Sequence, residues 1–239
     1  MKIPEIIFEN DDLLVLNKPS GMLSVPDRVQ SAVSLRELLE QKYGKIFTVH
    51  RLDRDTSGVI LYAKNETAHK YYSAAFENRT VTKIYYGFVH GSIAEPTGMI
   101  DAAIMEHPVQ KGTMVVNIKG KPAQTLYEVV HDFQLYSFVR FRILTGRTHQ
   151  IRLHCKHLGN PIVCDAVYGD GQPVKVSSFK KNYHLGKHTE EEKPLLGRLA
   201  LHASELSLTG LHGEPLQFNA PLPKDISALT KQLEKWKRI

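Results

Sequence analysis

The stretch VHRLDRDTSG, residues 49–58, gathers two arginines, two aspartates and a histidine into ten positions. It separates two apolar runs, KIFTV at 45–49 and VILYA at 59–63, and both runs are typical of β-strands. Charge is therefore concentrated in a turn between two predicted strands. Many such turns are merely solvated, but binding and catalytic residues also gather on loops that a rigid scaffold holds in place.

Outward from this turn, the sequence predicts more strands than helices. Strands are expected at 5–10, 13–18, 45–49, 58–64, 82–90, 124–132, 136–144, 201–208 and 215–219. Helices are expected at 34–44, 65–78, 147–159 and 224–238. Because the helices do not alternate regularly with the strands, the pattern favours an α+β fold over a doubly wound parallel sheet. The expected architecture is a mainly antiparallel mixed sheet flanked by helices.

Two of the expected helices carry clear end signals. Ser34 and Glu37 fit a capping box at the start of the first helix, and Gly44 can end it. Asn65 is suited to cap the second helix.

The strand expected at 136–144 alternates between two kinds of side chain. One of its faces is expected to meet water or a ligand, because that face would carry Phe138, Arg140 and Arg142.

Composition sets broad bounds on the protein. The chain has 239 residues, so it is expected to form a single domain over 1–239, with a polar loop insertion at 170–198. It has only two cysteines and no signal-peptide pattern, which favours the reducing cytoplasm. No apolar run approaches the ~20 residues that span a bilayer. The net charge of +6 suits a polyanionic partner such as RNA.

Two aspartates in the opening turn invite different interpretations. Asp55 is followed by Thr56, Ser57 and Gly58, which is typical of a solvated turn. Asp53 lies in a sequence flanked by arginines, and nearby guanidinium groups would keep its carboxylate ionised. An ionised carboxylate in a partly enclosed turn can act as a nucleophile or as a base.

Five blocks of this sequence resemble the RluA-type pseudouridine synthases, in the order of that family and over nearly the whole chain. The family similarity is expected to begin near residue 5, so no room is expected ahead of it for the accessory RNA-binding domain of many relatives. The five blocks are NKPSGMLSVP at 17–26, HRLDRDTSGVILYAK at 50–64, VTKIYYGFVHG at 81–91, RILTGRTHQIRLHCKHLGNPIVCDAVYG at 142–169 and LALHASELSLTGLHGEPLQFNAPLP at 199–223.

The resemblance implies an enzyme that isomerises uridine in ribosomal or transfer RNA to pseudouridine, without a cofactor. It makes Asp53 the essential carboxylate, which either attacks C1′ of the ribose or removes the C2′ proton. It implies that Arg147 pairs with Asp53, although a contact to RNA phosphate is the alternative. Tyr85 matches the active-site tyrosine of the family, and its alternative is an ordinary core aromatic.

The resemblance also implies residues that bind RNA or assist in flipping the base, namely Arg51, His50, Lys83 and Arg152. Arg51 corresponds to the arginine that fills the gap left by the extruded uridine. His50 is expected to orient the turn rather than to transfer protons. Cys164 stands where relatives commonly have glycine, so the bend at Asp165 is expected to differ locally.

Other functions receive less support from the sequence. His149, His154, Cys155 and His157 crowd one stretch, but their spacing does not fit a metal site. NKPSG lacks the pattern of a phosphate-binding loop, so an ATP site is not expected.

Two functional alternatives stay open. One is a non-catalytic RNA-binding protein on the same fold, and the other is a hydrolase with Asp55 as its acid. The segment 170–198 contains five lysines and three consecutive glutamates, Glu190 to Glu192, and is equally compatible with RNA binding and with an idle surface loop. The protein is expected to be a monomer.

Overall fold

The computed structural model describes residues 2–27, 29–180, 183 and 191–237. The chain divides into two compact units. Unit 1 comprises Met1–Tyr85 and His202–Pro221, and unit 2 comprises Tyr86–Leu201 and Leu222–Ile239. The expectation of a single domain over 1–239 stays a prediction.

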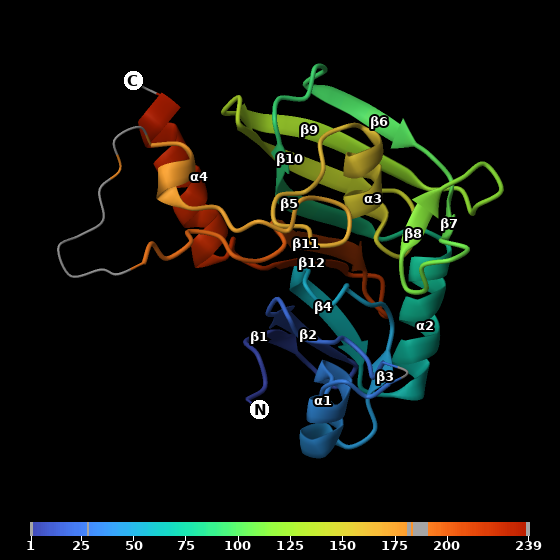
Figure 1. The fold of residues 1–239 in the computed structure, drawn as a ribbon. Coiled ribbons are helices and arrows are strands. Elements are labelled where there is room, and N and C mark those ends of the chain that lie inside the picture. Colours follow the sequence, from blue (N-terminus) through green and yellow to red (C-terminus); the bar gives the residue numbers. More distant parts are fainter. Residues whose placement is uncertain (1, 28, 181–182, 184–190, 238–239) are drawn as a thin grey trace. The chain divides into compact units, whose positions relative to one another are not determined.

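The sheet of unit 1 is mixed but mainly antiparallel (Figure 1). Its strand order is β1-β2-β4-β11, with β3 paired to β4 and β12 paired to β11. The β4/β11 pair is parallel, and the other pairs are antiparallel. The bounds are β1 Ile6–Glu9, β2 Leu13–Lys18, β3 Phe47–Thr48, β4 Ser57–Ala63, β11 Leu201–Thr209 and β12 Pro215–Asn219.

Gly58 allows the two parallel strands to approach each other. It pairs with Ala203, has a φ of +118°, and a Cβ at this position would lie 2.0 Å from the Ala203 carbonyl oxygen. Glycine is therefore required directly after the opening turn, because a larger residue would push β11 away.

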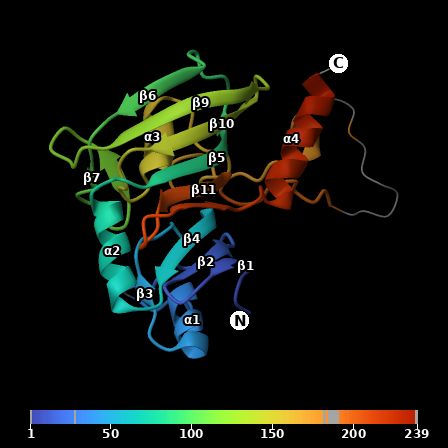
Figure 2. The same cartoon turned by 180° about the vertical axis from the view of Figure 1, so that it is seen from behind.

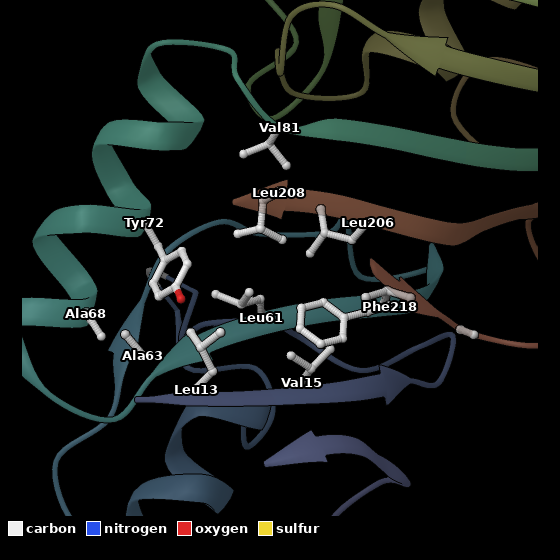
Figure 3. Close-up of a cluster of buried hydrophobic side chains, with 12 residues drawn as sticks. Leu13, Val15, Leu61, Ala63, Ala68, Tyr72, Val81, Leu206, Leu208 and Phe218 are labelled. Carbon is white, nitrogen blue, oxygen red and sulfur yellow. The ribbon is translucent and has the colours of Figure 1, made fainter. Parts of the chain in front are cut away.

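The helices of unit 1 begin as their sequences predict. The helix α1, Leu35–Tyr43, has the full Ser34–Glu37 capping box, and the helix α2, Glu66–Glu77, is capped by the Asn65 side chain. Figure 3 shows how α2 and the strands share one apolar core. Its fully buried members include Leu13, Val15, Leu61, Ala63 and Ala68.

Unit 2 contains a second antiparallel region, in the order β5-β10-β9-β6. The helix α3, Gln150–His157, covers one face of it: α3 lies in front of β9 and β10 in Figure 1 and behind them in Figure 2. The strand bounds are β5 Thr82–His90, which begins in unit 1, β6 Thr97–Asp101, β9 Gln124–Asp132 and β10 Tyr136–Ile143. The remaining elements are the hairpin β7 Ile104–Glu106 and β8 Met114–Val116, the 3₁₀ turn Val176–Ser178, and α4 Lys224–Lys237.

The α+β fold class and the mainly antiparallel mixed sheet are confirmed, but three details differ from the sequence predictions. The helix expected at 147–159 begins only at Gln150, because His149 adopts a left-handed backbone with a φ of 55°. Strands β6, β7 and β8 were not predicted. On β10, Arg142 is exposed as expected, but Phe138 is buried and stacks on Tyr86, with ring centroids 5.5 Å apart.

Only part of the insertion expected at 170–198 can be compared, because 181–182 and 184–190 lie outside the described residues. The described part contains the 3₁₀ turn and a bridge between Val174 and Leu196. Across the described chain, no helix combines the length and the apolar character needed to cross a membrane.

Candidate active site

The turn that opens β4 is fastened to the loop that follows β2. Lys18, at the end of β2, is fully buried, and its ammonium donates hydrogen bonds to three backbone carbonyls. Two acceptors, Pro19 and Met22, lie in its own loop at 3.1 and 2.8 Å, and the third is Arg54 at 2.9 Å. A buried charge is tolerated only with such partners, so Lys18 joins the two segments. Its role in NKPSG is therefore structural.

Three further hydrogen bonds join the same two segments. The Ser20 hydroxyl donates to the Asp55 carbonyl at 2.7 Å. The Gly21 amide donates to the Arg54 carbonyl at 2.9 Å, and the Arg54 Nε donates back to the Gly21 carbonyl at 3.2 Å. The two residues that follow Asp53, Arg54 and Asp55, are thereby both held by hydrogen bonds.

Asp53 itself is half-buried in this turn, and its electrostatic field reaches Tyr85. Tyr85, on β5, is 8% exposed. Burial raises the pKa of the Tyr85 phenol, and the negative charge of Asp53 raises it further. The phenol therefore keeps its proton at neutral pH. Asp53 and Tyr85 are two of the predicted catalytic residues, and their catalytic roles stay predictions.

His50 has a supporting position in the turn. Its Nε2 accepts a hydrogen bond from the Leu61 amide at 3.0 Å, and its ring stacks on Phe76 with centroids 4.5 Å apart. Burial, aided by the charge of Lys83, lowers the pKa of His50 to about 3, so the ring is neutral at pH 7. These contacts support its expected role in orienting the turn, and a contact with RNA stays a prediction.

The two other RNA-binding candidates of unit 1 differ in exposure. Arg51 is exposed, so its side chain is available to a ligand. Lys83 is 9% exposed, and its Nζ lies 5.7 Å from the centroid of the Phe76 ring. Burial, and secondarily the charge of Arg79, lowers the pKa of Lys83. Binding of RNA by either residue stays a prediction.

Arg147 lies in the turn between β10 and α3, where two contacts fix it. Its backbone amide donates to the Gln150 Oε1 at 3.0 Å, and its Nε donates to the Pro122 carbonyl at 3.1 Å. The first contact holds the backbone of this turn, and the second holds the side chain against the connection between β8 and β9.

Gln150 is the centre of a buried polar network beneath Arg147. Its amide nitrogen donates to the Gln124 carbonyl at 2.9 Å and to the Thr125 hydroxyl at 3.0 Å, and its carbonyl oxygen accepts from the Thr145 hydroxyl at 2.7 Å. Thr125 in turn lies 2.9 Å from the His154 Nδ1. All groups of the Gln150 amide are therefore satisfied, as burial in a low dielectric requires.

Arg152 is buried on α3 and forms a bidentate ion pair with Asp165, with both distances 2.7 Å. Burial would by itself raise the pKa of Asp165, but the hydrogen bonds and charge of Arg152 and the amides of Tyr168 and Val167 lower it overall. The pair fixes the loop 164–169. A contact between Arg152 and RNA stays a prediction.

The bend before Asp165 has an unusual backbone at Cys164, whose φ is 60°. This left-handed region favours glycine, in agreement with the glycine expected here from the family. The loop is completed by Tyr168, whose hydroxyl lies 2.9 Å from the His149 Nδ1 and accepts from the Met114 amide at 2.8 Å.

The predicted site residues thus fall into two groups. Asp53, Tyr85, His50, Arg51 and Lys83 belong to unit 1. Arg147 and Arg152 belong to unit 2, so the pairing of Arg147 with Asp53 stays a prediction.

The sequence-based reasoning missed two structural residues, Lys18 and Gln150. Both lie inside the quoted family blocks, which was the only signal available for them.

A metal centre is not indicated by the described part of the chain, where no cluster of three or more His, Cys, Asp or Glu side chains is suitable for an ion. His149 and His154, two residues of the histidine-rich stretch, are instead engaged with the hydroxyls of Tyr168 and Thr125.

Comparisons with known proteins agree with the sequence blocks. The family model described as RNA pseudouridylate synthase matches residues 12–157. The dual-specificity RNA pseudouridine synthase RluA of Vibrio vulnificus is 38% identical over 213 residues, which cover 85% of this chain and 76% of the relative. The ribosomal large subunit pseudouridine synthase D of Pasteurella multocida is 34% identical over 236 residues, or 96% of this chain and 70% of the relative.

A solved structure supports the fold. The human RNA pseudouridylate synthase domain containing 4 superposes with a TM-score of 0.73 at 24% identity, covering 96% of this chain and 93% of the human chain. With this fold and these relatives, the chain belongs to the RNA pseudouridylate synthase family of isomerases, and within that family it is of the RluA type.

Proposed function

We propose that this protein converts uridine to pseudouridine within ribosomal or transfer RNA, with Asp53 as the essential carboxylate. The relatives RluA and synthase D support this substrate class by their names. The observation that carries the assignment of Asp53 is its position. It is half-buried in a turn fastened by Lys18, and its charge acts on the buried Tyr85 phenol.

The reaction is an isomerisation that depends on an anion fixed beside the sugar, and it needs no cofactor. The bond between C1′ and N1 breaks, the base rotates, a bond forms between C1′ and C5, the C5 proton leaves and N1 gains a proton. Cleavage builds positive charge on the sugar, which a nearby carboxylate stabilises. Asp53 acts either by attack at C1′ or by removal of the C2′ proton, and both routes need its ionised form.

The other residues take supporting roles in this proposal. Arg147 pairs with Asp53, keeps it ionised and directs it toward the sugar. Tyr85 stacks on the uracil and assists at C5. Arg51 occupies the gap that the flipped uridine leaves, because a stacked base hides its sugar from the carboxylate.

The variant Asp53→Asn tests the proposal, because it removes the charge and keeps the shape. It should abolish release of tritium from RNA labelled at uridine C5, and RNA affinity should stay within about tenfold, or ~1.4 kcal/mol. Release of tritium at the wild-type rate would exclude Asp53 from the reaction.

Tritium release, gel retardation and detection of free base together separate the two alternatives from the proposed function. A non-catalytic RNA-binding protein would retard RNA in a gel and release no tritium from it. A hydrolase using Asp55 would liberate free base, whereas an isomerase leaves the base attached to its strand.

We propose further that the protein acts as a monomer in the cytoplasm. Both cysteines, Cys155 and Cys164, are buried free thiols, which is compatible with a reducing compartment.

A further inference from the structure

We infer that Ser24 is a positioning residue that sets the direction of the Asp53 carboxylate by clasping the preceding residue, Leu52. This inference rests on the proposed role of Asp53. It concerns the last part of the NKPSGMLSVP block, to which the proposed reaction assigns no task.

The clasp consists of two hydrogen bonds between one hydroxyl and one residue. The Ser24 Oγ donates to the Leu52 carbonyl at 2.8 Å and accepts from the Leu52 amide at 3.1 Å. Both residues are buried, Ser24 at 3% and Leu52 at 5% exposure. Buried backbone groups need partners, and for Leu52 this single side chain satisfies the donor and the acceptor.

Ser24 is itself held in place from two elements. Its carbonyl accepts from the Tyr62 hydroxyl on β4 at 2.7 Å and from the Arg36 amide on α1 at 3.3 Å. Burial raises the pKa of Tyr62, so this phenol remains a donor at all pH values of interest. The clasp therefore connects the turn to the rigid part of unit 1.

The position of the clasp determines what it controls. The Leu52 carbonyl belongs to the peptide plane that enters Asp53, and the Asp53 carbonyl, in the plane that leaves it, accepts from the Thr56 amide at 3.2 Å. Lys18 holds the next carbonyl, that of Arg54. With successive planes fixed, the Cα–Cβ bond of Asp53 has one direction. Without Ser24, the entering plane is free to rotate while the carboxylate itself is intact.

A single-turnover assay with Ser24→Ala tests this inference. Tritium release should slow at least tenfold at saturating enzyme, since small misplacements of reacting groups are costly. RNA affinity should stay within about twofold. Exchange of the Leu52 amide hydrogen should be faster in the variant, because that amide loses its acceptor. Ser24→Cys, which keeps a donor and an acceptor at this position but makes weaker hydrogen bonds, should give an intermediate rate and serves if Ser24→Ala does not fold.

The matched control is Ser137→Ala. Ser137 is also a buried serine that donates to a backbone carbonyl, that of Gly91 at 2.8 Å, but it lies on β10 in unit 2. This variant should release tritium at the wild-type rate per folded molecule.

Several results would overturn the inference. These are a wild-type rate in Ser24→Ala, an equal loss of rate in Ser137→Ala, or a loss of RNA affinity as large as the loss of rate. Failure of the proposed function has a different signature, namely no tritium release by the wild-type protein. Amide exchange still decides the clasp in that case, since unchanged protection of Leu52 in Ser24→Ala would refute it.

Discussion

Lys18 is a charged residue used as a structural one. Its ammonium is buried and donates hydrogen bonds to three backbone carbonyls, one of which lies 36 residues away in the sequence. A buried ion is stable only when hydrogen bonds replace its hydration. The arrangement therefore ties the turn that carries Asp53 to the end of β2 with a single side chain.

Replacement of Lys18 by methionine tests this role. Methionine keeps the apolar stem but removes the donor of the Pro19 and Met22 carbonyls, whereas the Arg54 carbonyl keeps the Gly21 amide. Each buried carbonyl that finds no water costs about 1–3 kcal/mol. The free energy of unfolding, measured with urea, should fall by roughly 3 kcal/mol or more. The control Lys45→Met removes an exposed lysine paired with Glu66 and should leave the urea midpoint unchanged. Equal midpoints for both variants would show that Lys18 does not join the segments.

His50 links stability to pH. The unfolded histidine gains a proton near its ordinary pKa of 6.5, and the folded one gains it only at about 3. Between these values the unfolded state binds more protons, so stability falls as the pH falls.

Between pH 6.5 and 3, the free energy of unfolding should depend less on pH in His50→Phe than in the wild type. The difference in slope should correspond to one proton. Phenylalanine can keep the stacking on Phe76 but cannot titrate, and it cannot accept from the Leu61 amide. The variant should therefore be less stable at pH 7, and its deficit should shrink in acid. Urea unfolding across the pH range measures this. Parallel curves would mean that His50 is not the linked group.

At the scale of elements, α3 owes its position to polar contacts as much as to apolar packing. Gln150 at its start donates a hydrogen bond to β9, and Arg152, two residues later, holds the loop 164–169 through Asp165. A buried, doubly hydrogen-bonded pair gives a loop one geometry, because every alternative leaves a charge unpaired in a low dielectric.

Loss of Arg152 should therefore be costly. Arg152→Met strands the buried Asp165, and breaking such a pair typically costs about 3–5 kcal/mol of unfolding free energy. The pKa of Asp165 is lowered in the folded wild type, so its stabilising effect is present above the unfolded pKa near 3.8 and is lost as the pH falls through the folded pKa. In the variant the charge and hydrogen bonds of Arg152 are lost, and burial would then raise that pKa, so the folded state would bind the proton before the unfolded state does. The deficit of Arg152→Met should therefore be largest at neutral pH and should shrink as the pH falls.

Arg140→Met is the matched control, because the Arg140 guanidinium lies 3.6 Å from Glu128 and is 36% exposed. Urea unfolding at pH 7 should show little change for Arg140→Met and a large change for Arg152→Met. Similar losses in the two variants would argue against a structural ion pair on α3.

At the scale of the whole molecule, net charge is the relevant property. The chain carries +6 at pH 7, with a pI near 9.2. Contacts between basic side chains and RNA phosphates release counterions, which makes binding sensitive to salt.

RNA affinity should consequently weaken steeply between about 50 and 200 mM salt, a range over which several phosphate contacts cost orders of magnitude. Fluorescence anisotropy with a labelled RNA measures the slope of log Kd against log salt. Asp53→Asn should have the same slope, because it removes no cation. A flat response would mean that the basic residues do not form the RNA-binding surface.

Most helices and strands of this protein were predictable from the sequence, because their signals are local. The candidate catalytic residues come from the family blocks, and their roles stay predictions. Capping by Ser34 and Asn65 depends on neighbours three residues away, and the family blocks are contiguous strings. Strand β6 escaped prediction because Gly98 interrupts its pattern; its missing Cβ leaves room for the Tyr127 ring of the paired strand.

The tertiary structure alone decided which partners the buried polar groups have. Whether a lysine or a serine near the N-terminus is exposed or holds the turn that carries Asp53 depends on residues about 30 positions away, as for Ser24 and Leu52, which are 28 apart. The Ser57–His202 contact, which joins residues 145 positions apart, is a still longer example. Local periodicity carries no information on such pairs, since the energy that selects them arises only when folding removes water from both groups.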